Sequence, residues 1–321
     1  MKPSSWQALS RVFVVFGLLW GSAQAQEATI KRATELRHLV QRRAVPPGVD
    51  SVLFPSSPGT WHWSSTSRIH TGSVNMYNYG NAMQGSTGGV ANRMGTRQGW
   101  AVAVNYTANS LAADEVVRTI RASGGRAMAV QADVADEAQV LRMFEQVDAK
   151  LGRLTGLVNN AGVVDVTARV EDMSVARWKR MFDINVIGSL ICAREAVRRM
   201  STRHGGAGGS IINLSSAAAR LGAPGQYVDY AAAKGAIDAF TIGLAKEVAG
   251  EGIRVNAVRP GLIETEIHAS GGLPNRVKDL QHQVPMQRGG SAEEVAQAIV
   301  WLLSDAASYT TMSLLDVSGG R

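Results

Sequence analysis

Apolar and amphipathic segments alternate along the chain from about residue 100 onward. Short, nearly all-apolar runs predict strands that are buried on both faces, at residues 101–105, 127–132, 154–158, 210–214, 253–258 and 313–317. Amphipathic helices are predicted between them, at residues 111–122, 137–151, 175–199, 230–249 and 292–303. Strands that alternate with helices predict a doubly wound α/β fold of Rossmann-like type, with a parallel sheet covered by helices on both faces.

The first 25 residues have a different pattern, which resembles a secretory signal. Lys2 and Arg11 precede the apolar run 12–20, and residues 23–25 (Ala-Gln-Ala) form a small-residue cleavage site. This run is too short to span a bilayer, and no other stretch of the sequence has the pattern of a membrane-spanning helix. A genuine signal would place the mature protein outside the cytoplasm.

Within residues 26–98, the stretch Glu27 to Arg43 has the pattern of a basic helix with a thin apolar stripe, and no sustained period follows from Val45 to Arg97. Beyond Val45 the residues are rich in Pro, Ser, Gly, Thr and Asn, and such a composition buries too little apolar surface to offset the entropy of ordering the chain. We therefore expect an irregular extension. The predicted organisation is a signal-like segment at 1–25, an irregular extension at 26–98 and one α/β domain at 99–321.

Composition and charge exclude some classes of function. Hydrophobic residues make up 45% of the chain and charged residues 18%, as in a globular protein. The formal net charge is +7, but Lys and Arg are scattered, so we expect no nucleic-acid partner. The single cysteine, Cys192, can form no internal disulfide. Residues 61–63 (Trp-His-Trp) and His70 lack carboxylate or cysteine partners at ligand spacing, so we expect no metal site.

Side chains suited to proton transfer follow the run at 210–214. This run ends at Ser215-Ser216, and Tyr230 and Lys234 lie four residues apart in the next predicted helix. Residues four apart share a helix face, so the cation of Lys234 is expected beside Tyr230, where it would lower the pKa of the phenol toward neutrality. Such a tyrosine can act as a general acid or base, with the Ser216 hydroxyl holding a carbonyl or alcohol oxygen. Alone, Tyr-x-x-x-Lys is a weak motif, because a solvated helix face often contains it.

Further motifs accompany these residues in a fixed order. Ligands of parallel α/β sheets bind at the carboxyl ends of the strands, where several of the motifs lie. They are Asp133-Val134, Asn159-Asn-Ala-Gly162, Asn185 in the long helix, Ser216, Tyr230 with Lys234, Pro260-Gly-Leu-Ile-Glu-Thr265 and the closing Asp316-Val-Ser-Gly-Gly320. Together they resemble the short-chain dehydrogenase/reductase family (SDR), from about Gly99 to Arg321.

This resemblance implies an NAD(P)-dependent enzyme that interconverts an alcohol and a ketone by hydride transfer. Tyr230 would be the acid/base, and Lys234 would lower its pKa and hold the nicotinamide ribose. Ser216 would bind the reacting oxygen, and Asn185 would hold a water in the proton relay. Tyr227 is a rival phenol, but the residue four positions after it is alanine, so Tyr230 is favoured.

The same resemblance implies the cofactor contacts. Asp133-Val134 would contact the adenine, Asn160 the cofactor ribose region and Ile263 the nicotinamide carboxamide. The strand at 101–105 ends at Asn105 without the carboxylate that selects NAD in dinucleotide folds, which favours NADP, with NAD as the alternative. No arginine directly follows to bind a 2′-phosphate.

One family element is not recognisable. The nearest candidate for the glycine-rich phosphate loop begins at Thr87-Gly88, but Asn92 and Met94 stand where glycines are expected, and no apolar strand precedes it. The sequence therefore predicts that the first strand is lacking or replaced. This leaves an alternative function, that of a non-catalytic remnant or an exported SDR-like protein unable to bind dinucleotide.

The segment 264–287 is the expected substrate loop. His268, Arg276, Lys278 and His282 in it suit a polar or anionic substrate, while a solvated loop explains them equally well. Sugars, acyl thioesters and simple ketones all stay open as substrates.

The resemblance also implies a homo-oligomer, a tetramer or dimer. NADP(H) chemistry favours a cytoplasmic location, and the signal-like start favours export.

Overall fold

The computed structural model describes residues 99–321 and the backbone of residues 75–79. The chain divides between Thr71 and Gly72, and all described residues belong to the second unit. The signal-like segment, most of the predicted extension, the Trp-His-Trp sequence at 61–63, His70 and the candidate loop at Thr87-Gly88 lie outside the described residues.

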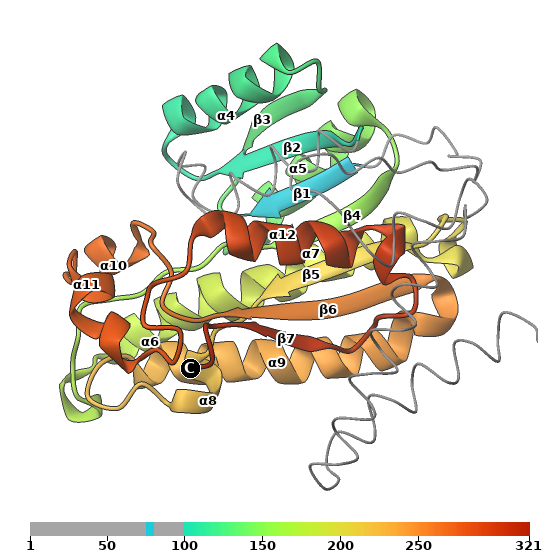
Figure 1. Cartoon of the computed structure of the whole chain (residues 1–321). Helices are drawn as coiled ribbons and strands as arrows, with labels where there is room; N and C mark the ends of the chain where they lie inside the picture. The colour runs from blue at the N-terminus through green and yellow to red at the C-terminus, as the bar shows by residue number, and fades with distance from the viewer. Residues whose placement is uncertain (1–74, 80–98) are drawn as a thin grey trace, which may run out of the picture. The chain divides into compact units, whose positions relative to one another are not determined.

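The core of the fold is a seven-stranded sheet in which all neighbouring strands are parallel (Figure 1). Its strand order is β3-β2-β1-β4-β5-β6-β7. The strands are β1 (Asn75–Tyr79), β2 (Ala101–Tyr106), β3 (Ala127–Gln131), β4 (Leu154–Asn159), β5 (Gly209–Leu214), β6 (Ile253–Pro260) and β7 (Leu314–Val317). The doubly wound α/β prediction is confirmed, and the order reverses between β1 and β4, where such sheets bind ligands.

The prediction that the first strand is lacking is wrong, and the alternative, replacement by another sequence, agrees with the structure. Residues Asn75–Tyr79 lie between β2 and β4, pairing Tyr77 with Ala103 on one side and Leu157 on the other. Sequence patterning missed this strand because its residues, Asn-Met-Tyr-Asn-Tyr, form no apolar run. Sheet pairing needs only main-chain N–H and C=O groups, so a polar segment can fill a central position.

Helices cover both faces of the sheet, and the alternation of side chains along β2 shows how. Val102 and Val104 face α4 (Ser110–Ala122) and α12 (Ala292–Leu303). Ala101 and Ala103 face the opposite layer, built from α5 (Glu137–Leu151), α7 (Gly188–Met200) and α9 (Val228–Val248). Because successive strand side chains point to opposite faces, an all-apolar strand provides both interfaces at once.

The predicted helix at 175–199 is divided by a π-helical turn. It consists of α6 (Val175–Phe182), the turn Asp183–Ile187 and α7, and Asn185 lies in the turn. Such π turns are rare in proteins overall, and those that occur are frequently found at functional sites.

Short helices lie where the sequence predicted loops. They are α8 (Ala218–Leu221), α10 (Ile267–Ser270) and α11 (Arg276–Leu280), with single 3-10 turns at Val170–Asp172, Thr202–His204, Ala249–Glu251, Gln281–Gln283 and Asp305–Ala307. In the part of the chain that the structure describes, no helix combines the length and apolarity needed to cross a bilayer.

Candidate active site

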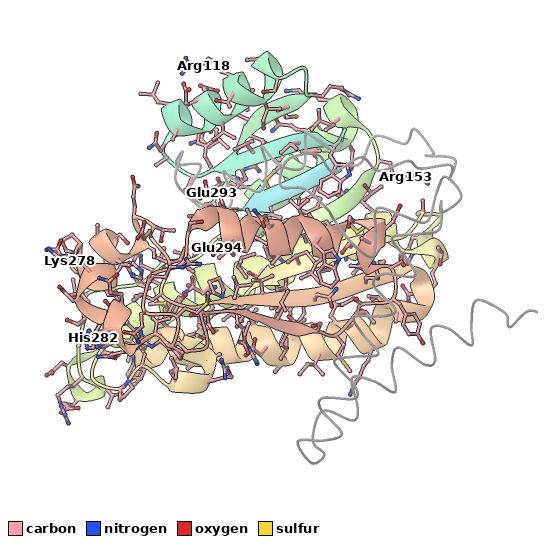
Figure 2. The ribbon with its side chains drawn as sticks, viewed as in Figure 1. Arg118, Arg153, Lys278, His282, Glu293 and Glu294 are labelled. Atoms are coloured by element: carbon pink, nitrogen blue, oxygen red, sulfur yellow. The ribbon has the colours of Figure 1, made fainter. Side chains whose placement is uncertain are left out.

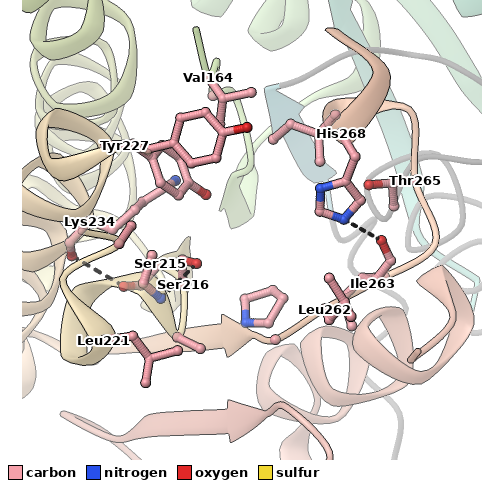
Figure 3. Close-up of a pocket in the computed structure, with 18 of the residues that line it drawn as sticks. Val164, Ser215, Ser216, Leu221, Tyr227, Lys234, Leu262, Ile263, Thr265 and His268 are labelled. Atoms are coloured by element: carbon pink, nitrogen blue, oxygen red, sulfur yellow. Dashed lines mark hydrogen bonds between the residues drawn. The ribbon is translucent and has the colours of Figure 1, made fainter. Parts of the chain in front are cut away.

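A cavity of about 510 Å³ lies at the carboxyl ends of β5 and β6 (Figure 3). Five of the predicted site residues line it: Asn160, Ser216, Tyr230, Lys234 and Ile263. They come from segments far apart in the sequence, the loop after β4, the loop after β5, the first two turns of α9 and the loop after β6. The parallel sheet brings them together because it places the ends of these strands along one edge.

Ser216 and Tyr230 face the same space. The Ser216 hydroxyl accepts a hydrogen bond from the Ala218 amide at 3.1 Å, which fixes its rotamer at the end of β5. Burial raises the pKa of Tyr230 above its ordinary value, and a hydrogen bond with Ser216 opposes part of that rise. The phenol is therefore held protonated at neutral pH, the state of a general acid.

The predicted lowering of the Tyr230 pKa by Lys234 is wrong for this arrangement. The Lys234 ammonium lies over the face of the Tyr230 ring, 5.6 Å from its centroid. Its Nζ donates a 2.6 Å hydrogen bond to the Leu214 carbonyl. Spacing along a helix predicts that two side chains are neighbours, but the charge influences the phenol less than burial does.

The pKa of Lys234 is also shifted from its ordinary value. Only 4% of the residue is exposed, and burial lowers the pKa of its ammonium to about 8, a shift that the charge of Asp238 opposes. Asp238 lies one turn further along α9 and accepts hydrogen bonds from Arg259 at 2.7 and 3.0 Å. A buried cation whose pKa lies this low is a mark of a functional site.

Asn185 lies behind the cavity wall. Its Oδ1 accepts from the Val163 amide at 2.7 Å, and its Nδ2 donates to the Val163 carbonyl at 2.9 Å. A Cβ added to Gly162 would lie 3.2 Å from Asn185 Oδ1 and 3.5 Å from Lys234 Nζ. The side chain of Asn185 therefore fastens the loop after β4 against the lysine.

The other predicted cofactor residues lie at the ends of β2 and β3 and are not part of the cavity wall. Asn105 is buried, and its Nδ2 donates to the carbonyls of Val130 and Ala132 at 3.3 and 3.0 Å. The Asp133 carboxylate accepts from the Ala135 amide at 2.9 Å. Val134 packs against Gly188, where an added Cβ would come within 2.7 Å of its Cγ2.

These positions fit the two ends of a dinucleotide, the nicotinamide ribose at one end and the adenine at the other. The Lys234 ammonium and Asn160 in the cavity wall suit ribose hydroxyls. Gly162 leaves space beside them, because an added Cβ there would approach Asn185 Oδ1 to 3.2 Å. Asp133 and Val134 lie further along the same edge of the sheet, after β3. Residues 80–98 lie outside the described residues.

Sequence reasoning missed a buried ion pair next to Tyr230. Arg177 of α6 donates to Asp229 through Nε at 2.7 Å and Nη2 at 3.2 Å, and the two side chains are 9% and 2% exposed. Asp229 Oδ1 also accepts from the Tyr230 amide at 3.0 Å. No pattern along the chain signals this pair, because its members are 52 positions apart.

A chain of buried amides supports the same helix from the sheet side. Asn159 Nδ2 donates to Asn213 Oδ1 at 2.9 Å, and Asn213 Nδ2 donates to Thr241 Oγ1 at 2.9 Å. These bonds connect β4 and β5 to α9, which carries Tyr230 and Lys234. Buried polar networks of this kind fix one arrangement of the elements that they join.

The four basic residues of the expected substrate loop fall into two groups. His268 and Arg276 line the cavity, and His268 Nε2 lies 3.0 Å from the Ile263 carbonyl (Figure 3). Lys278 and His282 are exposed and lie on the outer side of this region (Figure 2). Tyr227 is buried in the cavity wall, so the rival phenol neighbours Tyr230.

Comparison with known proteins agrees with this arrangement. A family model described as Enoyl-(Acyl carrier protein) reductase matches residues 80–321, an earlier start than the Gly99 that the motifs predict. Uncharacterized oxidoreductase YgfF of Escherichia coli (strain K12) is 56% identical over 225 residues, which cover 70% of this chain and 91% of the relative.

Two further similarities extend the comparison. A 3-oxoacyl-[acyl-carrier-protein] reductase of Synechocystis sp. is 38% identical over 223 residues, covering 69% of this chain and 87% of the relative. A solved Serratia marcescens short-chain dehydrogenase/reductase mutant superposes with a TM-score of 0.70 at 29% identity, covering 78% of this chain and 97% of that one. Similarity to oxidoreductases over most of their length does not favour a non-catalytic remnant. The sheet order, the cavity and these relatives together identify the chain as an NAD(P)-dependent oxidoreductase that belongs to the short-chain dehydrogenase/reductase family.

Proposed function

We propose that this enzyme interconverts a secondary alcohol and a ketone, with Tyr230 as the acid/base. The observation that carries the proposal is the meeting of Ser216, Tyr230 and Lys234 in one cavity. When bound, NADP(H) supplies the chemistry of hydride transfer to or from the reacting carbon. The relative called 3-oxoacyl-[acyl-carrier-protein] reductase supports the same class of reaction, reduction of an oxo group.

The residues of this chain supply the proton and the orientation. The Ser216 hydroxyl donates to the carbonyl oxygen of the substrate, and the Tyr230 hydroxyl delivers the proton that turns this oxygen into an alcohol. Lys234, buried beside the ring, stabilises the phenolate that remains. In the oxidative direction the phenolate takes the proton from the alcohol. Asn185 holds the loop at Val163 that closes the wall near Lys234 and, by family resemblance, is proposed to order a water for the proton relay.

NADP is the cofactor that we propose, because β2 ends at Asn105-Tyr106 without a carboxylate to accept bonds from ribose hydroxyls. Asp133 and Val134 are proposed to contact the adenine and Ile263 the carboxamide. The test is the ratio of kcat/KM for NADPH to that for NADH with one ketone. A ratio above about 10 supports NADP, and a ratio below 1 contradicts it.

Binding of NADPH tests the first requirement of the proposal, that this chain holds the cofactor. NADPH is titrated into the full purified chain while its fluorescence is followed. Saturable binding below millimolar concentration is expected. No binding at millimolar NADPH would contradict the proposal and favour the remnant hypothesis.

A homo-oligomer, such as a tetramer, and a cytoplasmic location complete the proposal. Val175, Trp178 and Phe182 occupy one face of α6 and are exposed, as is Ile187 in the π turn after it. Apolar residues at this spacing form a stripe that a second subunit can cover. Size-exclusion chromatography with light scattering is expected to show a mass of two or four chains, and a monomer would contradict the assembly.

A further inference from the structure

One wall of the active-site cavity carries an arginine that the reaction chemistry does not use. Arg276 is the first residue of α11, and its guanidinium lies over the Tyr227 ring, 5.3 Å from the centroid. Its Nη2 donates a 2.7 Å hydrogen bond to Gln226 Oε1. Stacking and this bond fix the plane of the guanidinium while most of its N–H donors stay available.

Within the described residues, this charge has no carboxylate partner. The ionisable groups that act on Arg276 are Tyr227 and a second cation, Arg321, which also lines the cavity. Glu266 lines the cavity too, but it is exposed and forms no ion pair with Arg276.

Two other half-buried arginines near the site differ in this respect. Arg177 is paired with Asp229, and Arg259 is paired with Asp238. Arg276 is half-buried, and removing a charge from water is unfavourable unless it is paired, so this arginine in a cavity wall favours an anion supplied from outside. A guanidinium and a carboxylate match through two parallel hydrogen bonds.

The histidine of this wall does not compete for that anion. His268 lies on the same loop, and burial lowers the pKa of its imidazole, with repulsion from Arg276 adding to the effect. Its Nε2 is engaged with the Ile263 carbonyl at 3.0 Å. At neutral pH the positive charges that line the cavity are therefore Arg276 and Arg321, together with Lys234 beside Tyr230.

The position of Arg276 limits the size of the ligand. Tyr227 immediately precedes α9, and Tyr230 lies three residues later in its first turn. Tyr227, Tyr230 and Arg276 line one cavity of about 510 Å³, so an anion bound at the cation stacked on Tyr227 shares that space with the Tyr230 side chain. An anion bound there belongs to a small substrate whose reacting carbon faces Tyr230.

We propose that Arg276 binds the carboxylate of the substrate, which makes the enzyme a dehydrogenase of short hydroxy acids and a reductase of the corresponding oxo acids. This inference rests on the proposed alcohol–ketone reaction. The carboxylate accepts two hydrogen bonds from the guanidinium, and the hydroxyl, a few carbons away, reaches Ser216 and Tyr230. Arg321 adds positive charge at the same wall.

The test compares matched acids and amides as substrates. The probes are 3-hydroxybutanoate, 4-hydroxypentanoate and 5-hydroxyhexanoate, each beside its primary amide, oxidised by the full chain with NADP. The wild type is expected to prefer at least one acid over its amide by roughly 10- to 100-fold in kcat/KM, the range for a charged hydrogen-bonded pair. Arg276→Gln is expected to lower this acid-to-amide ratio by a similar factor, and Arg276→Lys to restore part of it.

The control variant is Lys278→Gln, which removes an exposed cation from the same short helix. Its acid-to-amide ratio is expected to equal that of the wild type. A wild type that turns over amides as well as acids would overturn the proposal. So would an Arg276→Gln variant that changes the KM for NADPH and leaves the ratio unchanged, because Arg276 would then serve the cofactor.

A binding measurement separates this proposal from the reaction itself. Pentanoate and pentanamide cannot be oxidised at a carbinol, and their effect on the melting temperature is measured with NADPH present. Stabilisation by pentanoate alone, lost in Arg276→Gln, would support the anion site even if no alcohol were oxidised. Equal effects of the two compounds would overturn it, whatever the outcome for turnover.

Discussion

The carboxylate of Asp229 receives two hydrogen bonds from Arg177, at 2.7 and 3.2 Å, immediately before Tyr230 in the sequence. The same carboxylate accepts from the Tyr230 amide, and Arg177 also donates to the Val166 carbonyl at 2.6 Å. The first turn of α9 is thereby fastened to α6 and to the loop after β4. An ion pair this deeply buried sets the position of the turn that presents the phenol.

Removing one member of this pair is expected to destabilise the domain. Arg177→Met leaves the Asp229 charge buried without a partner, and such losses reduce the free energy of unfolding by about 3–5 kcal/mol. The control is Arg180→Met, whose pair with Asp165 is 3.5 Å long and whose side chain is 56% exposed, with an expected change below about 1 kcal/mol. Urea unfolding of both variants measures the difference, and equal stabilities would contradict a structural role for the pair.

Gly188 is expected to tolerate no side chain. An added Cβ would lie 2.7 Å from Val134 Cγ2 and 3.0 Å from the Val134 carbonyl oxygen. Gly188→Ala should therefore destabilise the domain by about 1–3 kcal/mol and displace the predicted adenine site after β3.

The matched control for Gly188 lies in α9. An added Cβ at Gly243 meets no heavy atom within 4 Å. Gly243→Ala should leave stability unchanged or raise it by up to about 1 kcal/mol, because alanine is the better helix former. Thermal unfolding compares the two variants, and a Gly188→Ala protein as stable as the wild type would contradict the close approach.

The two directions of the reaction are expected to respond differently to pH. Burial raises the pKa of Tyr230, so the protonated phenol needed for ketone reduction dominates at neutral pH. The phenolate needed for alcohol oxidation increases about tenfold per pH unit below that pKa, so oxidation should rise steeply between about pH 7 and 9. Reduction should stay nearly constant to about pH 7 and decline through about pH 8, where half of the Lys234 side chains have lost their charge.

Initial rates in both directions, at saturating cofactor, test this pH dependence. A plateau of the oxidation rate by pH 7 would contradict it. That result would show that the Tyr230 pKa is lowered to neutrality in the working complex, as the Tyr-x-x-x-Lys spacing alone suggests.

The sequence predicts most of the fold because burial leaves a direct pattern. The apolar runs became β2 to β7 and the amphipathic segments became helices within a few residues of their expected ends. The exception is β1, whose Asn and Tyr residues show no apolar run although the backbone pairs on both sides. Main-chain hydrogen bonding cannot be recognised from the hydrophobic pattern when the side chains of the strand are polar.

The candidate site was predictable as a set of residues, and less so as a set of interactions. Motif order identifies Ser216, Tyr230 and Lys234, and the structure places them in one cavity. Motif order does not predict that Lys234 donates a hydrogen bond to the Leu214 carbonyl, or that burial dominates the pKa of Tyr230. Both depend on distances between segments that approach each other only in the folded chain.

The most direct test of the central claim is ketone reduction by Tyr230→Phe compared with the wild type. Phenylalanine keeps the ring and removes the proton donor, so kcat should fall about 10²- to 10⁴-fold while NADPH fluorescence shows that the cofactor still binds. Tyr309→Phe, at a fully exposed position, is the control and should reduce the ketone at the wild-type rate. A Tyr230→Phe enzyme that binds NADPH and reduces the ketone as fast as the wild type would contradict the assignment of Tyr230 as the acid/base.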